Sequence, residues 1–299
     1  MKNFSRKYFA SILLLTGVIT IQSLTGFSNN INSSFSIKYD ISDAIVHSDI
    51  TPSSAVGDTT VSSLVSGSNP SAVYYYDEIP TLAQNDLLYQ YFKNSVIVGD
   101  SIGAGWGIQC IKNSTDPVMG NFQSLAFPGF CVHSAFDASI EDAGTPMYKG
   151  AKRPVWESLQ LMAAEHPGET THIYLHFGYK DQQWKDTPEL YVQLIQTLQQ
   201  YVPDSDITII GASYMYPGKN GEPYTSANIK TLDLAMQNYA NAYGWGFVNV
   251  GDLLADQNGD LNPAYCSDKF MHLNASGYDI WKKALIGYAL ARMTAAGII

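Results

Sequence analysis

The sequence predicts an α/β protein with a flavodoxin-like three-layer sandwich, in which helices cover both faces of a five-stranded parallel sheet. Short apolar runs alternate with longer segments of helical period from residue 81 onward, and this alternation is the order of a βα fold. The first run, Ser95 to Val98, is short, mostly apolar and β-branched, which is typical of a strand buried on both faces.

Each predicted element has a local signal. A helix over 81–92 leads to the first strand, and the second strand, 122–127, ends at a Pro-Gly pair. An amphipathic segment over 154–166 predicts a helix, and Asp186-Thr-Pro-Glu189 starts another that runs to Tyr201. The remaining predicted strands are 171–177, 207–212 and 246–250, and the remaining helices are 226–243 and a last one capped by Asn274.

The N-terminus has the pattern of an export signal, because Lys2, Arg6 and Lys7 precede a nearly uncharged apolar segment. We predict that residues 1–27 are a signal peptide, or a signal anchor, since the low-charge stretch approaches the length of a membrane span. Residues 28–70 are rich in Ser, Thr and Asn, and we expect a flexible leader. Residues 71–299 then form the folded domain of a secreted or cell-surface protein, tethered to the membrane if the N-terminal segment stays on.

Composition limits the partners. A formal net charge of −10 disfavours nucleic acid and anionic membrane surfaces, because both repel an acidic protein. Twenty tyrosines and five tryptophans suit contact with carbohydrate or protein, and core packing also explains them. An exported protein can form one disulfide among Cys110, Cys131 and Cys266, which leaves at least one thiol. We expect no cofactor, no metal and a monomer.

Ser101 is the first candidate for chemistry. The strand stops at Gly99-Asp100-Ser101, and a residue at the carboxyl end of a buried parallel strand lies where open α/β sheets bind their ligands. Ser101 is therefore a candidate nucleophile. The alternative is a polar turn in which Ser101 or Asp100 only caps the following helix.

A serine hydroxyl needs a base to take its proton, and His272, in a loop before the last helix, is the best candidate. His133 is the rival, because it follows a Pro-Gly turn at the end of the second strand. His172 and His176 point to one face of the third strand and are expected to be packed residues. They have no evident third partner for a metal site.

Gly99-Asp-Ser101, together with Asp268 and the pattern His272-Leu-Asn-x-x-Gly-Tyr278, resembles the GDSL, or SGNH, hydrolase family over residues 94–296. The resemblance implies the SGNH hydrolase fold and a serine esterase, or acylhydrolase, in which Ser101 attacks an acyl carbonyl and His272 relays the proton. It also implies that the N–H groups of Ser101 and Gly129 hold the oxyanion.

The sequence departs from the family pattern at two positions. The family reads Gly-x-Asn-Asp in its third block, and this chain has Lys180 in place of that asparagine. Lys180 then assists the oxyanion, contacts an anionic group of the substrate, or marks a weakened enzyme. The family's aspartate stands three residues before the histidine, where this chain has Lys269. Asp268 orients His272 if one loop residue bulges out, and otherwise a backbone carbonyl does so.

Aromatic residues in the loops that follow the strands suggest the substrate. We expect stacking on sugar rings, although some of these side chains can simply cover the sheet. The predicted substrate-binding residues are Trp106, Phe130, Tyr179, Trp184 and Tyr214. The predicted function is hydrolysis of acyl esters, O-acetyl in the first place, on an extracellular carbohydrate. The alternatives are a glycan O-acetyltransferase, a lipid or thioester substrate, and a non-catalytic binding protein, which Lys180 and Lys269 favour.

Overall fold

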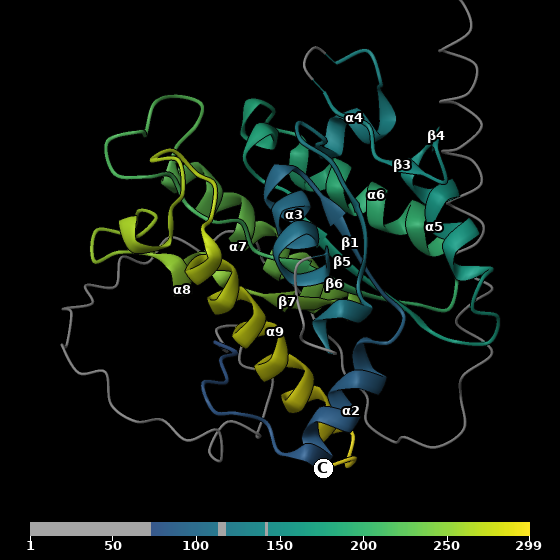
Figure 1. The fold of residues 1–299 in the computed structure, drawn as a ribbon. Coiled ribbons are helices and arrows are strands. Elements are labelled where there is room, and N and C mark those ends of the chain that lie inside the picture. Colours follow the sequence, from purple (N-terminus) through teal and green to yellow (C-terminus); the bar gives the residue numbers. More distant parts are fainter. Residues whose placement is uncertain (1–72, 113–117, 141–142) are drawn as a thin grey trace, which may run out of the picture. The chain divides into compact units, whose positions relative to one another are not determined.

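The fold is a five-stranded parallel sheet in strand order β2-β1-β5-β6-β7, with helices on both faces (Figure 1). The structure, a computed structural model, describes residues 73–112, 118–140 and 143–299. The predicted signal segment (residues 1–27) and the predicted leader (residues 28–70) lie outside these residues. The strands of the sheet are β1 (Ser95–Gly99), β2 (Gln123–Ala126), β5 (Thr171–His176), β6 (Ser205–Ile210) and β7 (Gly246–Val248), and a short antiparallel hairpin pairs β3 (Met147–Tyr148) with β4 (Ala151–Lys152). The predicted fold class is confirmed.

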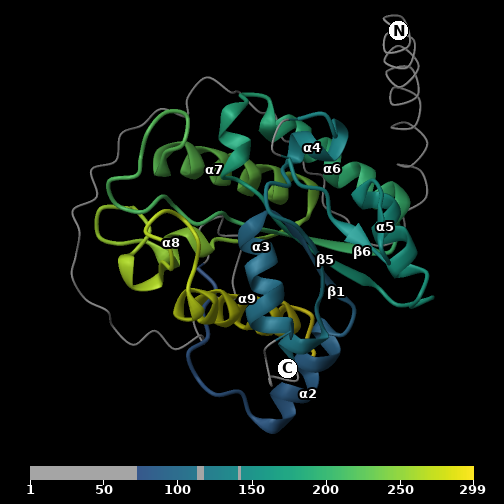
Figure 2. The same ribbon diagram turned by 45° about the horizontal axis from the view of Figure 1, so that its top comes forward.

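The helices divide into two layers, which Figure 2 shows above and below the sheet. One layer holds α4 (Val132–Phe136), α5 (Val155–Ala163), α6 (Thr187–Tyr201) and α7 (Ser226–Tyr243). The other holds α2 (Leu82–Phe92), α3 (Ser101–Trp106), α8 (Val250–Leu254) and α9 (Ala275–Ala295). A π-helical turn (Gly107–Lys112) extends α3, and 3₁₀ turns cover Met119–Asn121, Lys180–Gln183 and Pro263–Tyr265.

The alternation of side chains along the strands separates the two cores. In β1, Val96 and Val98 face the layer of α4 to α7, whereas Ile97 faces the layer of α3 and α9. All five residues of β1 are buried, because the strand lies between β2 and β5 and has a helix layer on each face. The apolar run that the sequence shows at this position is therefore the central part of the sheet.

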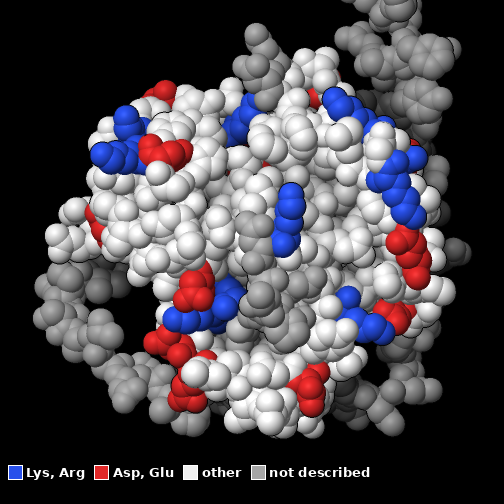
Figure 3. Space-filling view, in the orientation of Figure 1, with Lys and Arg blue, Asp and Glu red and all other residues white. Residues whose placement is uncertain are grey.

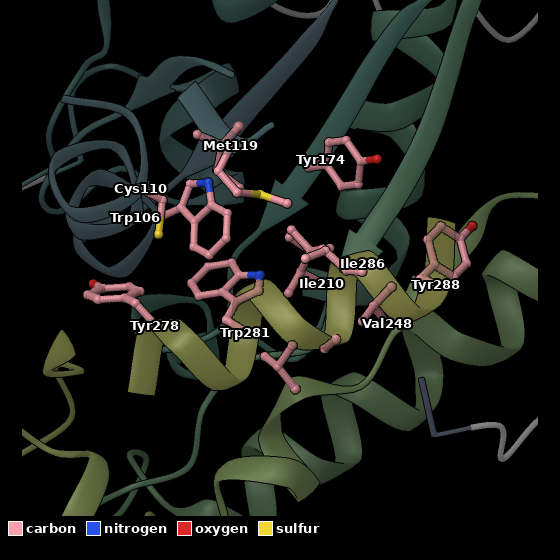
Figure 4. Close-up of a cluster of buried hydrophobic side chains, with 14 of the residues drawn as sticks. Trp106, Cys110, Met119, Tyr174, Ile210, Val248, Tyr278, Trp281, Ile286 and Tyr288 are labelled. Atoms are coloured by element: carbon pink, nitrogen blue, oxygen red, sulfur yellow. The ribbon is translucent and has the colours of Figure 1, made fainter. Parts of the chain in front are cut away.

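The α3–α9 core fixes the part of the molecule that carries the site (Figure 4). The indole rings of Trp106 on α3 and Trp281 on α9 are fully buried, with 5.1 Å between their centroids. The Tyr278 hydroxyl on α9 donates a hydrogen bond to the carbonyl oxygen of Ile102 on α3 at 3.0 Å. These contacts lock the start of α9, and the loop before it, against the helix that begins at Ser101.

Local signals located most boundaries to within one residue, whereas the predicted strand over 207–212 lies two residues earlier, at Ser205–Ile210. Thr81 caps α2, and the Asn274 side chain accepts a hydrogen bond from the Gly277 N–H at the start of α9. The predicted strand over 246–250 is too long, since Asn249 caps α8 and ends the strand at Val248. Among the described residues, no helix is both long and apolar enough to span a bilayer.

One face of the described domain is lightly charged. Figure 3 shows one face on which uncharged residues predominate, with acidic and basic side chains close to one another. Lys283 is an example, because its ammonium group lies 2.7 Å from an Asp77 carboxylate oxygen and 3.2 Å from an Asp279 oxygen.

Candidate active site

The turn after β1 leaves Ser101 half-buried while Asp100 caps the helix. The Asp100 Oδ1 atom accepts hydrogen bonds from the N–H groups of Ile102 at 2.9 Å and Gly103 at 3.5 Å. The turn is tight, because a Cβ atom on Gly99 would lie 2.2 Å from the carbonyl oxygen of His176 on β5. Since Asp100 provides the cap, the Ser101 hydroxyl is left to contact other groups.

Ser101, His272 and Asp268 form one hydrogen-bonded chain. The Ser101 Oγ atom lies 2.9 Å from His272 Nε2, and His272 Nδ1 lies 2.5 Å from Asp268 Oδ2. Ser101 and His272 are 171 residues apart in the chain, and the contact between α3 and α9 brings them together. This order of atoms has the geometry of a Ser-His-Asp triad.

The loop over Ser267–His272 holds the acid in place. The Asp268 Oδ1 atom accepts hydrogen bonds from the N–H groups of Phe270, Met271 and His272, at 2.8, 3.0 and 3.2 Å. Desolvation alone raises the pKa of Asp268, but the hydrogen bonds from the His272 side chain and these backbone groups lower it well below its usual range. Asp268 is therefore ionised at neutral pH and keeps the proton of His272 on Nδ1, so that Nε2 faces Ser101 as a proton acceptor.

Lys269 is the residue that lets Asp268 reach the histidine from four positions back. Its φ angle of 56° lies in the left-handed region, which is uncommon for a residue with a side chain. The exposed Lys269 bulges from the loop while the Ser267 N–H donates a hydrogen bond to the His272 carbonyl oxygen at 2.8 Å and closes the loop. The structure thus has the bulged arrangement with Asp268 beside His272.

Gly129 lies in a turn beside the end of β1. Its φ angle of 78° favours glycine, and the Phe130 N–H donates to the Phe127 carbonyl oxygen at 3.0 Å to close the turn. The Phe127 N–H in turn donates to the Gly99 carbonyl oxygen at 3.0 Å. This hydrogen bond joins the Gly129 turn to the residue that precedes Asp100 and Ser101.

Lys180 begins the 3₁₀ turn after β5, at the same edge of the sheet. Its positive charge lies close enough to the Cys131 thiol to lower the pKa of that group, although burial and the nearby Asp181 carboxylate raise it by more. Lys180 therefore lies near the segment that follows the Gly129 turn. Asp181, which the sequence did not single out, is buried next to it and accepts a hydrogen bond from the Val132 N–H.

Three of the predicted substrate-binding residues are corrected by the structure. Trp106 is fully buried under α9, Phe130 packs against Phe177 with 5.5 Å between ring centroids, and Tyr214 is 2% exposed with its hydroxyl bound to Asp252. Each of these aromatic rings follows a strand in the chain but turns into the core. None of the three can offer a face to a sugar ring.

The other two, Tyr179 and Trp184, are half-buried at the carboxyl edge. Tyr179 stacks on Tyr224 at 4.7 Å and meets the edge of Phe270 at 5.6 Å, so these three rings form an aromatic wall next to the His272 loop. Tyr224 and Phe270 were not predicted, because their position depends on loops that the sequence does not place.

The competing histidines have other partners. Trp184 stacks on His133 at 4.2 Å, and His133 Nε2 lies 3.1 Å from an Asp186 carboxylate oxygen, so His133 is turned toward Asp186. His172 pairs with Asp206 at 3.1 Å, and the buried His176 lies 3.3 Å from Asp100 and packs on Trp281.

Within the described residues, no three or more His, Cys, Asp or Glu side chains are grouped as metal ligands. All three cysteines of the chain lie in the described part, and no disulfide joins them there, so none of the pairings that the sequence left open is formed.

A parallel α/β sheet with a serine, a histidine and an aspartate in one hydrogen-bonded chain at its carboxyl edge defines a hydrolase-like site. The family model of the GDSL-like Lipase/Acylhydrolase family matches residues 97–280, which is more than half of the chain. This protein therefore belongs to the GDSL-like lipase/acylhydrolase family, and its sheet is that of the SGNH hydrolase fold.

Solved structures with a similar chain are distant in sequence. A GDSL-like lipase from Bacteroides thetaiotaomicron VPI-5482 is 15% identical, with a TM-score of 0.47 over 70% of this chain and 95% of that chain. A member of the lipolytic protein G-D-S-L family from Veillonella parvula DSM 2008 is 17% identical, with a TM-score of 0.42 over 66% and 96%. Est24, a carbohydrate acetylesterase from Sinorhizobium meliloti, is 15% identical, with a TM-score of 0.41 over 68% and 99%. No curated protein matches the chain.

Proposed function

We propose that this protein is an exported serine esterase that hydrolyses acyl esters on an extracellular carbohydrate, with O-acetyl esters as the preferred substrates. One observation carries the proposal: the 2.9 Å contact between Ser101 Oγ and His272 Nε2, with His272 Nδ1 on the ionised Asp268. A serine becomes a nucleophile when a base within hydrogen-bond reach takes its proton, and this geometry meets that requirement.

The reaction follows from these atoms. Ser101 Oγ attacks the acyl carbonyl carbon while its proton passes to His272 Nε2, and a tetrahedral intermediate forms. The C–O bond to the sugar then breaks, and His272 returns the proton to the leaving hydroxyl. Water then attacks the acyl carbon while its proton passes to His272 Nε2. The bond between this carbon and Ser101 Oγ breaks, His272 returns the proton to Oγ, and the carboxylic acid leaves. Asp268 stabilises the imidazolium that exists between these proton transfers.

The oxyanion of the intermediate needs donors on the side away from His272. The N–H groups of Ser101 and Gly129 are the proposed donors, because the Gly129 turn is bonded to the end of β1. Lys180, close to the same segment, adds a positive charge in place of the carboxamide that the family pattern has there. A flexible ammonium group aims a hydrogen bond less sharply than a carboxamide, and we expect turnover to be moderate.

The aromatic wall supports a carbohydrate as the substrate. Tyr179, Tyr224 and Phe270 offer flat apolar area beside His272, and two of the three carry a hydroxyl for hydrogen bonding. The basic and apolar segments at the N-terminus support export, which would place the enzyme with extracellular glycans. The bulged Lys269 removes one of the two features that favoured a non-catalytic protein, since Asp268 meets His272 in spite of it.

The test is labelling of the purified protein with a fluorophosphonate probe, followed by mass mapping of the labelled peptide. We expect labelling at Ser101 and its loss in Ser101→Ala and His272→Ala. The matched control is His166→Ala, a distant histidine beside Glu169, which should leave labelling intact. Absence of labelling in the folded wild-type protein would refute the esterase and leave a binding role.

The substrate class is tested by acetate release. Acetate release from an O-acetylated polysaccharide is compared with hydrolysis of aryl esters that carry short or long acyl chains. A second set of reactions contains an added acceptor glycan. Acetate release that is fastest from the polysaccharide supports the proposal. Faster hydrolysis of long acyl chains, or transfer of acetyl groups to the acceptor glycan, would contradict it.

A further inference from the structure

Asp181 is a buried carboxyl group that joins two loops of the site. Its residue is 1% exposed, and its Oδ1 atom accepts a hydrogen bond from the Val132 N–H at 2.8 Å, across 49 residues of chain. Val132 is the first residue of α4 and lies three positions after Gly129. Asp181 directly follows Lys180. The hydrogen bond therefore connects the turn of one proposed oxyanion donor to the segment of another.

Other contacts hold the same two segments together. The Thr187 hydroxyl donates to the Asp181 carbonyl oxygen at 2.8 Å, which fixes the 3₁₀ turn to the start of α6. Trp184, at the end of that turn, stacks on His133 of α4 at 4.2 Å. Two residues before Val132, Phe130 is buried against Phe177. Asp181 is buried in the same region, and its side chain accepts the hydrogen bond from the backbone of the other segment.

A carboxyl group is an unfavourable choice for such a buried position. Burial raises the pKa of Asp181 to about 7, the Asp100 carboxylate adds to the rise, and hydrogen bonds from the N–H groups of Val132 and Gly178 oppose it. An apolar side chain would avoid this desolvation, but it would leave the Val132 N–H without its acceptor. The hydrogen bond from the Val132 N–H explains why a carboxyl group occupies this position.

We propose that Asp181 is a positioning residue, which presets the Gly129 turn and Lys180 relative to Ser101 so that the oxyanion donors are aligned before substrate binds. The inference rests on the proposed esterase function, because it concerns the oxyanion of that reaction. Donors that are aligned in advance need no rearrangement during the reaction, and small displacements of such groups lower turnover steeply. Asp181 itself does not touch the substrate.

The test compares variants at both ends of the hydrogen bond by kcat and KM on an aryl acetate. Asp181→Ala removes the acceptor and should lower kcat about 10- to 100-fold with KM changed less than about threefold. Asp181→Asn keeps an oxygen that can accept from Val132 and should recover most of kcat. Val132→Pro removes the N–H from the other side, at a first helical position that tolerates proline, and should lower kcat as Asp181→Ala does.

Asp233→Ala is the matched control for lost stability. Asp233 is also a buried carboxyl group, and its Oδ1 atom accepts a hydrogen bond from the Ala212 N–H at 3.0 Å. We expect a comparable loss of thermal stability and an unchanged kcat. The inference is overturned if Asp181→Ala and Val132→Pro keep the wild-type kcat, or if Asp181→Asn is as slow as Asp181→Ala. Failure of the esterase proposal is recognised separately, because the wild-type protein would then not react at all.

Discussion

The raised pKa of Asp181 makes a quantitative prediction about stability. An acid whose pKa is higher in the folded state binds more protons when folded than when unfolded, so the free energy of unfolding falls as the pH rises between the two values. For Asp181 these values are its ordinary 3.8 and about 7. Each pKa unit corresponds to about 1.4 kcal/mol, so ionising the buried group costs about 4 kcal/mol in total.

Replacing the carboxyl group tests this value. Asp181→Asn cannot ionise, so the difference in the free energy of unfolding between wild type and variant should shift by about 2–3 kcal/mol from pH 5 to pH 8, in favour of the variant at the higher pH. The measurement is urea unfolding at a series of pH values. The shift with pH is informative whatever constant offset the carboxamide introduces.

The control is Asp204→Asn, which removes one carboxyl group at an exposed position before β6 and so leaves the buried group unchanged. If the Asp181→Asn curve is parallel to the wild-type curve within about 0.5 kcal/mol, Asp181 is ionised in the folded protein with an ordinary pKa, and the reasoning about its burial is refuted.

Two further predictions concern the loops around the site. Lys269→Gly should raise the free energy of unfolding by about 0.5–1 kcal/mol in urea unfolding and leave turnover unchanged, because glycine adopts a φ of 56° without strain; a loss of stability would contradict this conformation. Gly105→Ala should lower both the melting temperature and kcat, since the new Cβ atom would overlap the Tyr278 hydroxyl that bonds to Ile102. Removing that hydroxyl in the double variant with Tyr278→Phe should restore part of the stability, and if it restores none, the overlap is not the cause.

Local patterns in the sequence were sufficient for most of the secondary structure. The helix over 226–243 was predicted with its observed bounds, and Asn274 was predicted as the cap of the last helix. Both depend on side chains within a few residues of one another, which is the range over which apolar period and capping act. Short apolar strands alternate with helices along the chain, and this alternation likewise predicts the parallel sheet.

Both the sequence motifs and the tertiary structure were needed to establish the arrangement of the site. The motifs at Ser101 and His272 identified the pair, but only the packing of α9 on α3 shows that Oγ and Nε2 are 2.9 Å apart. The sequence left open whether Asp268 or a backbone carbonyl orients His272. The bulge at Lys269 brings Asp268 to His272. Whether one residue bulges from a loop depends on the tertiary contacts that close the loop.

For the aromatic residues that follow the strands, the sequence could not determine burial. Trp106, Phe130 and Tyr214 follow strands just as Tyr179 does, yet they lie in the core while Tyr179 joins an aromatic wall with Tyr224 and Phe270. An aromatic ring has favourable places both inside and at the surface, and the neighbouring elements decide between them.

Asp181 is a polar residue whose burial the sequence did not predict. Its neighbours in the chain indicate a polar, solvated turn, and its contact with Val132 exists only because two loops from distant parts of the chain meet at one edge of the sheet. The sequence by itself determined most of the helices and strands and indicated Ser101 and His272 as a candidate pair, because these features depend on local signals. The tertiary structure alone decided which aromatic side chains after the strands are buried and which loops share a hydrogen bond, because these contacts join residues far apart in the chain.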